Sequence, residues 1–114
     1  MNAENNPSCI DPISLSELVD ANYKNVSLGS VNNHELRMSV MTEQFGWHSH
    51  PSSDEMFMAI EGGLIVEFAD REILLSPGQI TIVPAGILHR TRPAGIRSVN
   101  LTFERRDSET VFID

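Results

Sequence analysis

Three of the four histidines lie in two short segments whose residue types suit a metal ion. The first segment reads Gly46-Trp47-His48-Ser49-His50, and Glu55 follows after four intervening residues. The second begins with Pro84-Ala85-Gly86 and, after two more residues, reaches His89. Three imidazoles and one carboxylate form a ligand set for a divalent transition metal such as Fe, Mn, Ni or Zn. The spacing of these residues therefore predicts metal chemistry.

The local backbone can bring these ligands to one point. Residues i and i+2 of a β-strand point to the same side, so His48 and His50 can bind one ion without a bend in the chain. Turn-forming residues at 51–54 return Glu55 to the histidines, and His89 arrives from a distant strand after the turn at 84–86. An ion that prefers six ligands would keep open positions for a reactant. Zinc held tetrahedrally by all four would instead be closed and structural.

Each of these residues also has an ordinary structural explanation. An isolated His-x-His pair is more often a solvated surface pair. Glu55 fits an exposed residue at the start of a strand, and His89 fits a core histidine satisfied by a hydrogen bond. The combination of three histidines, a carboxylate, a proline and glycines in register favours the metal site.

Together the two segments resemble the motifs of the cupin superfamily, a family of small jelly-roll β-barrels. The resemblance runs from Gly46 to His89 and implies metal ligands at His48, His50, Glu55 and His89. A spacing of six intervening residues before Gly62 selects Glu55 rather than its neighbour Asp54. One departure is Pro93, which stands where the family often has an asparagine that is not usually a ligand. The implied ligand set is therefore intact.

The periodicity of the chain predicts an all-β fold, a cupin-type jelly-roll barrel or sandwich. Short apolar runs are separated by turns rich in glycine and proline, the pattern of such folds. Tight turns are expected at Pro77-Gly78 and, as a hairpin corner, at Gly62-Gly63. The predicted strands are 36–41, 47–50, 56–61, 64–69, 73–75, 79–83, 89–91 and 98–103, with 26–28 and 111–113 as outer strands.

The N-terminal part of the chain lacks the strand pattern of the remainder. Residues 1–12 are predicted to form a flexible tail, followed by a single barrel domain over residues 13–114. Ser14 and Glu17 fit a capping box, and Leu15, Leu18 and Val19 follow helical spacing, so one short helix is expected there. The alternative is an irregular segment packed on the barrel.

The strand period of two predicts which side chains face the metal. If Glu55 points inward, Phe57 and Ala59 also point inward, and Thr91 follows His89 in the same way. On the last long strand three apolar side chains share a face and are predicted to be core. They are Val99, Leu101 and Phe103.

The aromatic and apolar residues beside the motifs are assigned to packing. Phe45 and Trp47 flank the first motif, where they could form a rim of the pocket, but packing is the preferred interpretation. Met56, Met58 and Ile60 are predicted to face away from the metal, toward a second sheet or a subunit interface. An outward apolar stripe is an ordinary sign of association, and cupin relatives are often dimers, so we expect a homodimer.

Composition narrows the class of protein. The chain of 114 residues has a formal net charge of −8, which argues against nucleic acid as a partner. It contains no apolar run long enough to span a bilayer, and its polar start does not resemble a signal peptide. The single cysteine, Cys9, cannot form an internal disulfide, so a reducing cytoplasm is expected.

Three functional hypotheses remain open. The first is a metal-dependent enzyme, a dioxygenase or an isomerase, that acts on a small oxygen-rich metabolite. The second is a non-catalytic module that binds a sugar or organic acid through a metal anchor, and the third is a structural metal. The family includes enzymes and binders, so the fold does not choose among them. Tyr23 and His34 lie upstream of the motifs, so we expect metal-centred chemistry without a dedicated protein base.

Overall fold

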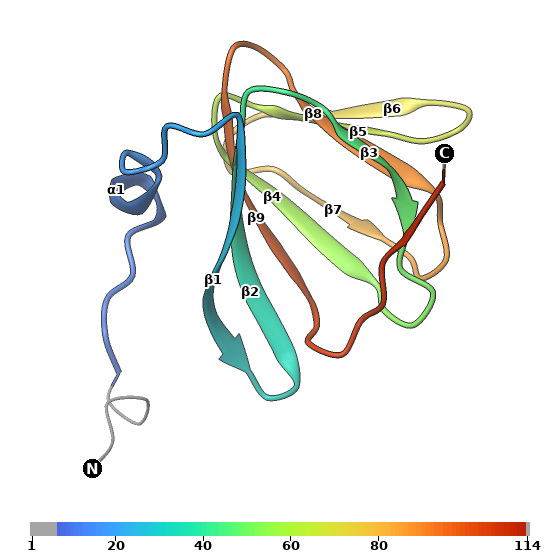
Figure 1. Ribbon diagram of the computed structural model, residues 1–114, viewed down its shortest axis with the longest axis horizontal. Coiled ribbons are helices and arrows are strands. Elements are labelled where there is room, and N and C mark those ends of the chain that lie inside the picture. The colour runs from blue at the N-terminus through green and yellow to red at the C-terminus, as the bar shows by residue number, and fades with distance from the viewer. Residues whose placement is uncertain (1–6, 114) are drawn as a thin grey trace.

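The ten strands form two antiparallel sheets that pack as two layers in this computed structural model, which describes residues 7–113 (Figure 1). In the first sheet the strand order is β1 (Tyr23–Val31), β2 (His34–Met41), β9 (Ser98–Arg105), β4 (Glu55–Glu61) and β7 (Ile80–Val83). In the second sheet the order is β10 (Val111–Phe112), β3 (Phe45–Ser49), β8 (His89–Pro93), β5 (Leu64–Glu67) and β6 (Glu72–Leu75).

This arrangement confirms the predicted all-β jelly-roll fold. Every predicted strand has an observed counterpart, and the two predicted outer strands are β1 and β10, each at the edge of a sheet. Part of the predicted tail, residues 1–6, lies outside the described residues. Within the described part of the chain, no helix has the length and apolar character needed to cross a membrane.

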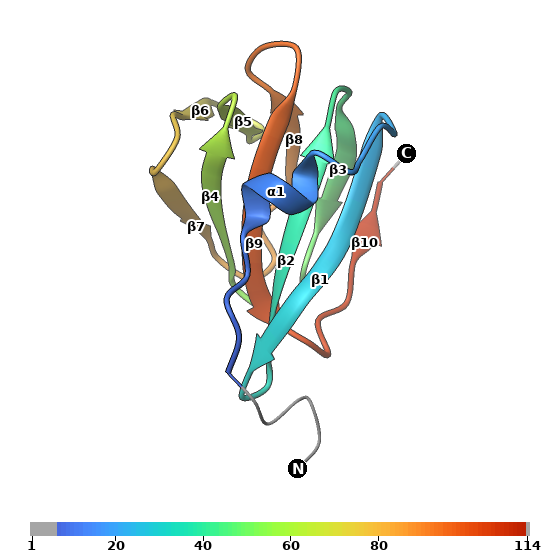
Figure 2. The ribbon, with the colours of Figure 1, turned by 90° about the vertical axis from the view of Figure 1, so that its left-hand side faces the viewer.

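The one helix of the described residues, α1 (Pro12–Ser16), begins before the predicted capping box. Its N-cap is Asp11, whose carboxylate accepts a hydrogen bond from the backbone N–H of Ser14 at 3.3 Å. Proline suits the first helical position because it has no N–H to satisfy there. Ser14 therefore lies inside the helix, and its prediction as the cap was wrong. The helix crosses the outer face of the first sheet (Figure 2), where Arg97 Nη2 donates to the Ser16 carbonyl at 2.6 Å.

Two apolar clusters hold the layers in place. The larger lies between the sheets, and it includes Phe57 and Ala59, which point inward as predicted. The smaller lies on the outer face of the first sheet and includes Val99. The members of the larger cluster are Met41, Phe57, Ala59, Leu64, Val66, Leu75 and Val83.

The predicted core face of β9 was only partly right. Val99 is fully buried in the outer cluster, but Leu101 and Phe103 are partly exposed on that outer face. The opposite side chains, Asn100 and Thr102, are buried and point between the sheets. The inner side of β9 is polar because it borders a cavity rather than the apolar core.

The turn at Gly62-Gly63 joins the two layers. Its glycines have φ values of 80° and 67°, in the left-handed region that favours glycine. The turn follows β4 in the first sheet and precedes β5 in the second, so it is a corner between sheets and not the predicted hairpin. The turn at Pro77-Gly78 likewise carries the chain from β6 back to β7.

Candidate metal centre

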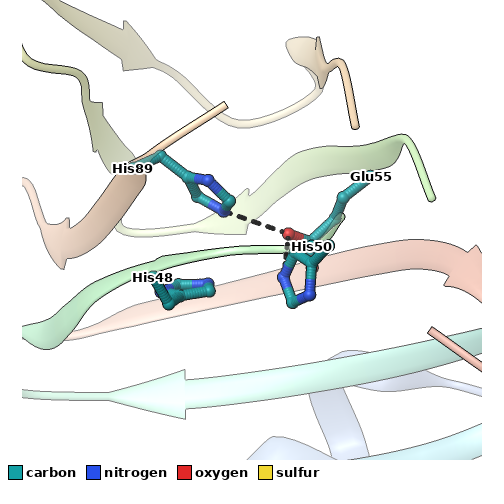
Figure 3. A group of neighbouring side chains, drawn as sticks. All are labelled: His48, His50, Glu55 and His89. Carbon is teal, nitrogen blue, oxygen red and sulfur yellow. Dashed lines mark hydrogen bonds and ion pairs between the residues drawn. The ribbon is translucent and has the colours of Figure 1, made fainter. Parts of the chain in front are cut away.

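Strands from both sheets bring the four predicted ligands together. His48 on β3 pairs with His89 on β8 in the second sheet, and Glu55 opens β4 in the first. His50 follows β3 directly. Figure 3 shows the four side chains pointing toward one another. Their potential ligand atoms all lie within 4.8 Å of one another, and all four residues are buried. The group could therefore hold a metal ion.

Two loops, joined by hydrogen bonds from backbone N–H groups, hold Glu55 beside the histidines. The backbone N–H of Gly86 donates to the His50 carbonyl at 2.9 Å, and that of Ala85 donates to Asp54 Oδ1 at 2.9 Å. These two hydrogen bonds connect the turn before β4 with the turn before β8. Asp54 thus holds the loops together, while its neighbour Glu55 points into the cluster.

Backbone carbonyls set the proton positions on the three imidazoles. Each Nδ1 lies within hydrogen-bond distance of a backbone carbonyl oxygen, which can only accept, so each Nδ1 carries the hydrogen. In the neutral ring Nε2 is then a free lone pair, as a metal ligand requires. The carbonyl partners of His48, His50 and His89 are Gly46 (2.7 Å), Glu109 (3.0 Å) and Ile87 (2.8 Å).

The Nε2 atoms of His50 and His89 both face the Glu55 carboxylate. Glu55 Oε1 lies 3.1 Å from His50 Nε2 and 3.2 Å from His89 Nε2 (Figure 3). A neutral imidazole has one N–H, which both rings already use at Nδ1. The cluster therefore needs either extra protons or one divalent cation. His50 Nε2 is also buried and, despite its proximity to Glu55, has no aligned hydrogen-bond partner in the described chain. The residues fit a metal ion.

The electrostatics of the cluster agree with this requirement. Burial lowers the pKa of His48. Burial also acts to lower the pKa of His50, but the Glu55 and Glu104 carboxylates outweigh it and raise that pKa to about 9. Burial acts to raise the pKa of Glu55, yet the facing His50 and His89 rings lower it overall. The site therefore has a negative potential that attracts positive charge.

A cavity of about 290 Å³ opens beside the cluster. Its wall includes Tyr23, which lies upstream of the two motifs in the sequence. Because β1 pairs with β2, Tyr23 lies on the inner face of the first sheet, close to the cluster despite its distance along the chain. The polar residues at alternate positions of β1 and β2 were the sequence signal that could have predicted a polar cavity wall. The polar wall contributed by β1, β2 and β9 consists of Tyr23, Asn25, Arg37, Ser39, Asn100, Thr102 and Glu104.

A second carboxylate, that of the partly buried Glu104, lies beside the cluster and was not predicted from the sequence. Its Oε2 lies 3.6 Å from His50 Nδ1, and this oxygen atom is buried without a hydrogen-bond partner among residues 7–113. Burial, together with the nearby Glu55 carboxylate, raises the pKa of Glu104. His34 is absent from the cavity wall and instead stacks on Phe103 at 5.2 Å between ring centroids.

The two aromatic residues beside the first motif have different positions. Phe45 lines the cavity, and its ring lies 5.0 Å from the His48 ring in an edge contact. Trp47 is not in the cavity wall, and the Arg90 guanidinium lies 4.5 Å from its ring centroid. The pairing of β3 with β8 shifts register between Phe45 and His48, which breaks the simple alternation.

Comparisons with known proteins agree with this architecture. A family model described as a cupin domain matches residues 35–102. The uncharacterized protein YdbB of Bacillus subtilis is 38% identical over 103 residues, which cover 90% of each protein.

Solved structures show the same fold at lower identity. A cupin-2 domain protein from Shewanella frigidimarina has a TM-score of 0.78 at 24% identity, over 85% of this chain and 94% of that one. The DMSP lyase DddQ from Ruegeria pomeroyi has a TM-score of 0.69 at 19% identity, over 80% of this chain and 51% of that one. With the family model matching more than half of its length, this chain belongs to the cupin domain family.

Proposed function

We propose that this cupin binds one divalent transition metal through His48, His50, Glu55 and His89, and that the metal binds a small oxygen-rich metabolite. The observation that carries the proposal is the convergence of four buried side chains whose potential ligand atoms all lie within 4.8 Å of one another. The donor set suits Fe, Mn, Ni or Zn. When bound, such an ion would polarise a ligand carbonyl or lower the pKa of a bound water.

The chain's own residues would shape and position the ligand. Phe45 and Phe57 form an apolar part of the cavity wall beside the histidines and would limit the access of water to a bound ligand. In the same cavity wall, Asn25, Ser39 and Asn100 present amide and hydroxyl groups that match the oxygens of a metabolite. The volume of about 290 Å³ lies at the lower end of ligand pockets, which favours a small molecule.

Two versions of this function differ in whether the ligand reacts. In the enzyme version, the metal-loaded protein carries out dioxygenase-like or isomerase-like chemistry. The DMSP lyase with the same fold supports enzymatic use of this architecture in general. In the alternative version, the protein is a non-catalytic module that binds a sugar or organic acid through the metal. Oxygen uptake by the Fe-loaded protein with ligand favours the first, and binding without any turnover favours the second.

Metal titration tests the proposal directly. We expect the chelator-treated protein to take up one Mn, Fe, Ni or Zn ion per chain, measured by calorimetry and elemental analysis. The two apolar clusters contain none of the four ligands, so circular dichroism should show that the sheets survive chelation. Unfolding on chelation would instead support a structural metal. Metal uptake no greater than the nonspecific uptake of an unrelated protein that lacks a histidine cluster would refute the metal site.

We also propose that the chain forms a homodimer through the outer face of the first sheet. Ile80 and Ile82 on β7 are 55% and 60% exposed and pair with Met58 and Met56 of β4, which gives a continuous apolar stripe. We expect Ile82→Glu to shift the sedimentation coefficient from dimer to monomer without loss of metal. The control is Ile96→Glu in the β8–β9 turn, outside this stripe, which should leave the dimer intact. A monomeric parent protein would contradict the proposal.

We also propose a cytoplasmic location, because the chain has a single cysteine. The single cysteine, Cys9, is exposed and free, and a chain with one cysteine gains no internal disulfide from an oxidising compartment. Fractionation of cells that produce the full-length protein would test the location.

A further inference from the structure

We propose that Arg37 is an anion-binding residue of the cavity and that the ligand is a small organic diacid. One end of this ligand would present oxygens to the metal, and its second carboxylate would pair with Arg37. The inference rests on the proposed function, because it requires a metal at the four-residue cluster to hold the first end.

Arg37 shares one cavity with the metal cluster. It lies on β2, in register with the buried Thr102 of β9, and lines the cavity together with His48 and Glu55. Strands β2 and β4 flank β9, which places their backbones about 10 Å apart at the usual strand spacing. A ligand of a few carbon atoms, placed between the side chains of Arg37 on β2 and Glu55 on β4, would span this distance.

The charge of Arg37 is not neutralised by the protein. No carboxylate of residues 7–113 forms a salt bridge with it, although acidic residues outnumber basic ones by 16 to 8. By contrast, Arg90 and Arg92 on the outer face of the second sheet both pair with Glu67. A partly buried cation that lacks a carboxylate partner in an acidic protein is suited to receive that partner from a ligand.

The wall of the cavity holds the guanidinium in a useful orientation. Arg37 Nε donates to Asn25 Oδ1, and Asn25 Nδ2 in turn donates to Ser39 Oγ at 2.8 Å. The two terminal Nη groups have no hydrogen-bond partner within the described chain. This leaves the planar fork of the guanidinium free to bind both oxygens of a carboxylate. The Tyr23 hydroxyl, 3.4 Å from Ser39 Oγ, lies beside the same group.

The surroundings favour a carboxylate over a more highly charged group. Arg37 is the only arginine or lysine in the cavity wall formed by the described residues, so a single negative charge would balance it. At the other end, a 2-hydroxy acid offers two oxygens to one metal ion. The small volume excludes large sugars. These features together identify short 2-hydroxy diacids as the class of ligand.

Calorimetry with matched acids tests the assignment. The probes are malate, 2-hydroxyglutarate and 2-hydroxyadipate, each compared with the monoacid in which a methyl group replaces the distal carboxylate. In the full-length Mn-loaded protein we expect at least one diacid to bind about tenfold more tightly than its monoacid, the effect of one charge-assisted bidentate contact. Arg37→Gln should abolish this preference, and Arg37→Lys, which keeps the charge but loses the fork, should reduce it.

The controls separate failure of this inference from failure of the proposed function. Arg106→Gln makes the same change of charge at an exposed position outside the cavity wall and should retain the preference. Metal content should be equal in all Arg37 variants. Equal binding of diacids and monoacids by the loaded parent, or an unchanged preference in folded Arg37→Gln, would overturn the role of Arg37 alone. Tighter binding of 3-phosphoglycerate than of any diacid would overturn the carboxylate class. A parent that takes up no metal would overturn the proposed function itself.

Discussion

Replacing His89 with alanine is expected to abolish metal binding while the two sheets remain folded. His89 is only 1% exposed, and its Nε2 faces Glu55, so the substitution removes a ligand atom from the inside of the cluster. Loss of a residue that merely orients a ligand costs about 10–100-fold in metal affinity, so loss of the ligand should exceed about 100-fold. We expect the same result for His50→Ala. The fold should survive because neither ring belongs to an apolar cluster.

The chain contains a matched control for these variants. His34, the fourth histidine, stacks on Phe103 and lies outside the cavity wall. His34→Ala should therefore keep the parent's metal content, measured by elemental analysis after equilibrium dialysis, with circular dichroism to confirm folding. Equal metal content in the parent and in folded His89→Ala would refute the assignment of the ligands.

Replacing Gly62 with alanine is expected to cost about 3 kcal/mol or more in the free energy of unfolding. Gly62 has a φ of 80°, and a Cβ built there would lie 2.0 Å from the carbonyl oxygen of Arg97. That oxygen belongs to the backbone before β9, so the corner between the sheets must move to relieve the overlap. Unfolding in denaturant, followed by circular dichroism, would measure the loss.

Gly78→Ala separates the backbone strain from this steric overlap. Gly78 has a similar φ of 89°, but a Cβ there would meet nothing within 4 Å. Its substitution should cost only the strain, about 1 kcal/mol. If Gly62→Ala proved as stable as Gly78→Ala, the close approach of Arg97 would be wrong. The motif glycine at position 62 therefore has a packing role, separate from the chemistry of Glu55.

The local sequence pattern was sufficient to predict the strands and to place the candidate metal ligands on a common side. Side chains alternate along any extended strand, so the spacing of His48 and His50 placed both rings on one side before any tertiary contact was known. The same alternation correctly placed Phe57 and Ala59 with Glu55, and Thr91 with His89. Glycine and proline marked the turns because their backbone preferences act within a few residues.

Local pattern failed where a neighbouring strand determined the outcome. Apolar alternation along β9 suggested a core face, but β9 lies at the centre of its sheet with α1 outside and a polar cavity inside. Phe45 and Trp47, two residues apart, should share a side, yet the register shift against β8 separates them. Asp11 replaced Ser14 as the helix cap because Pro12 starts the helix earlier.

The sequence by itself determined the all-β class, the order of the strands along the chain and the four residues that could hold a metal. Only the tertiary structure decided what faces them. Tyr23 and Arg37 lie far from Glu55 in the chain, and they line the same cavity because β1, β2, β9 and β4 lie side by side in one sheet. Pairing between distant strands depends on how all ten strands pack, which no short window of sequence contains.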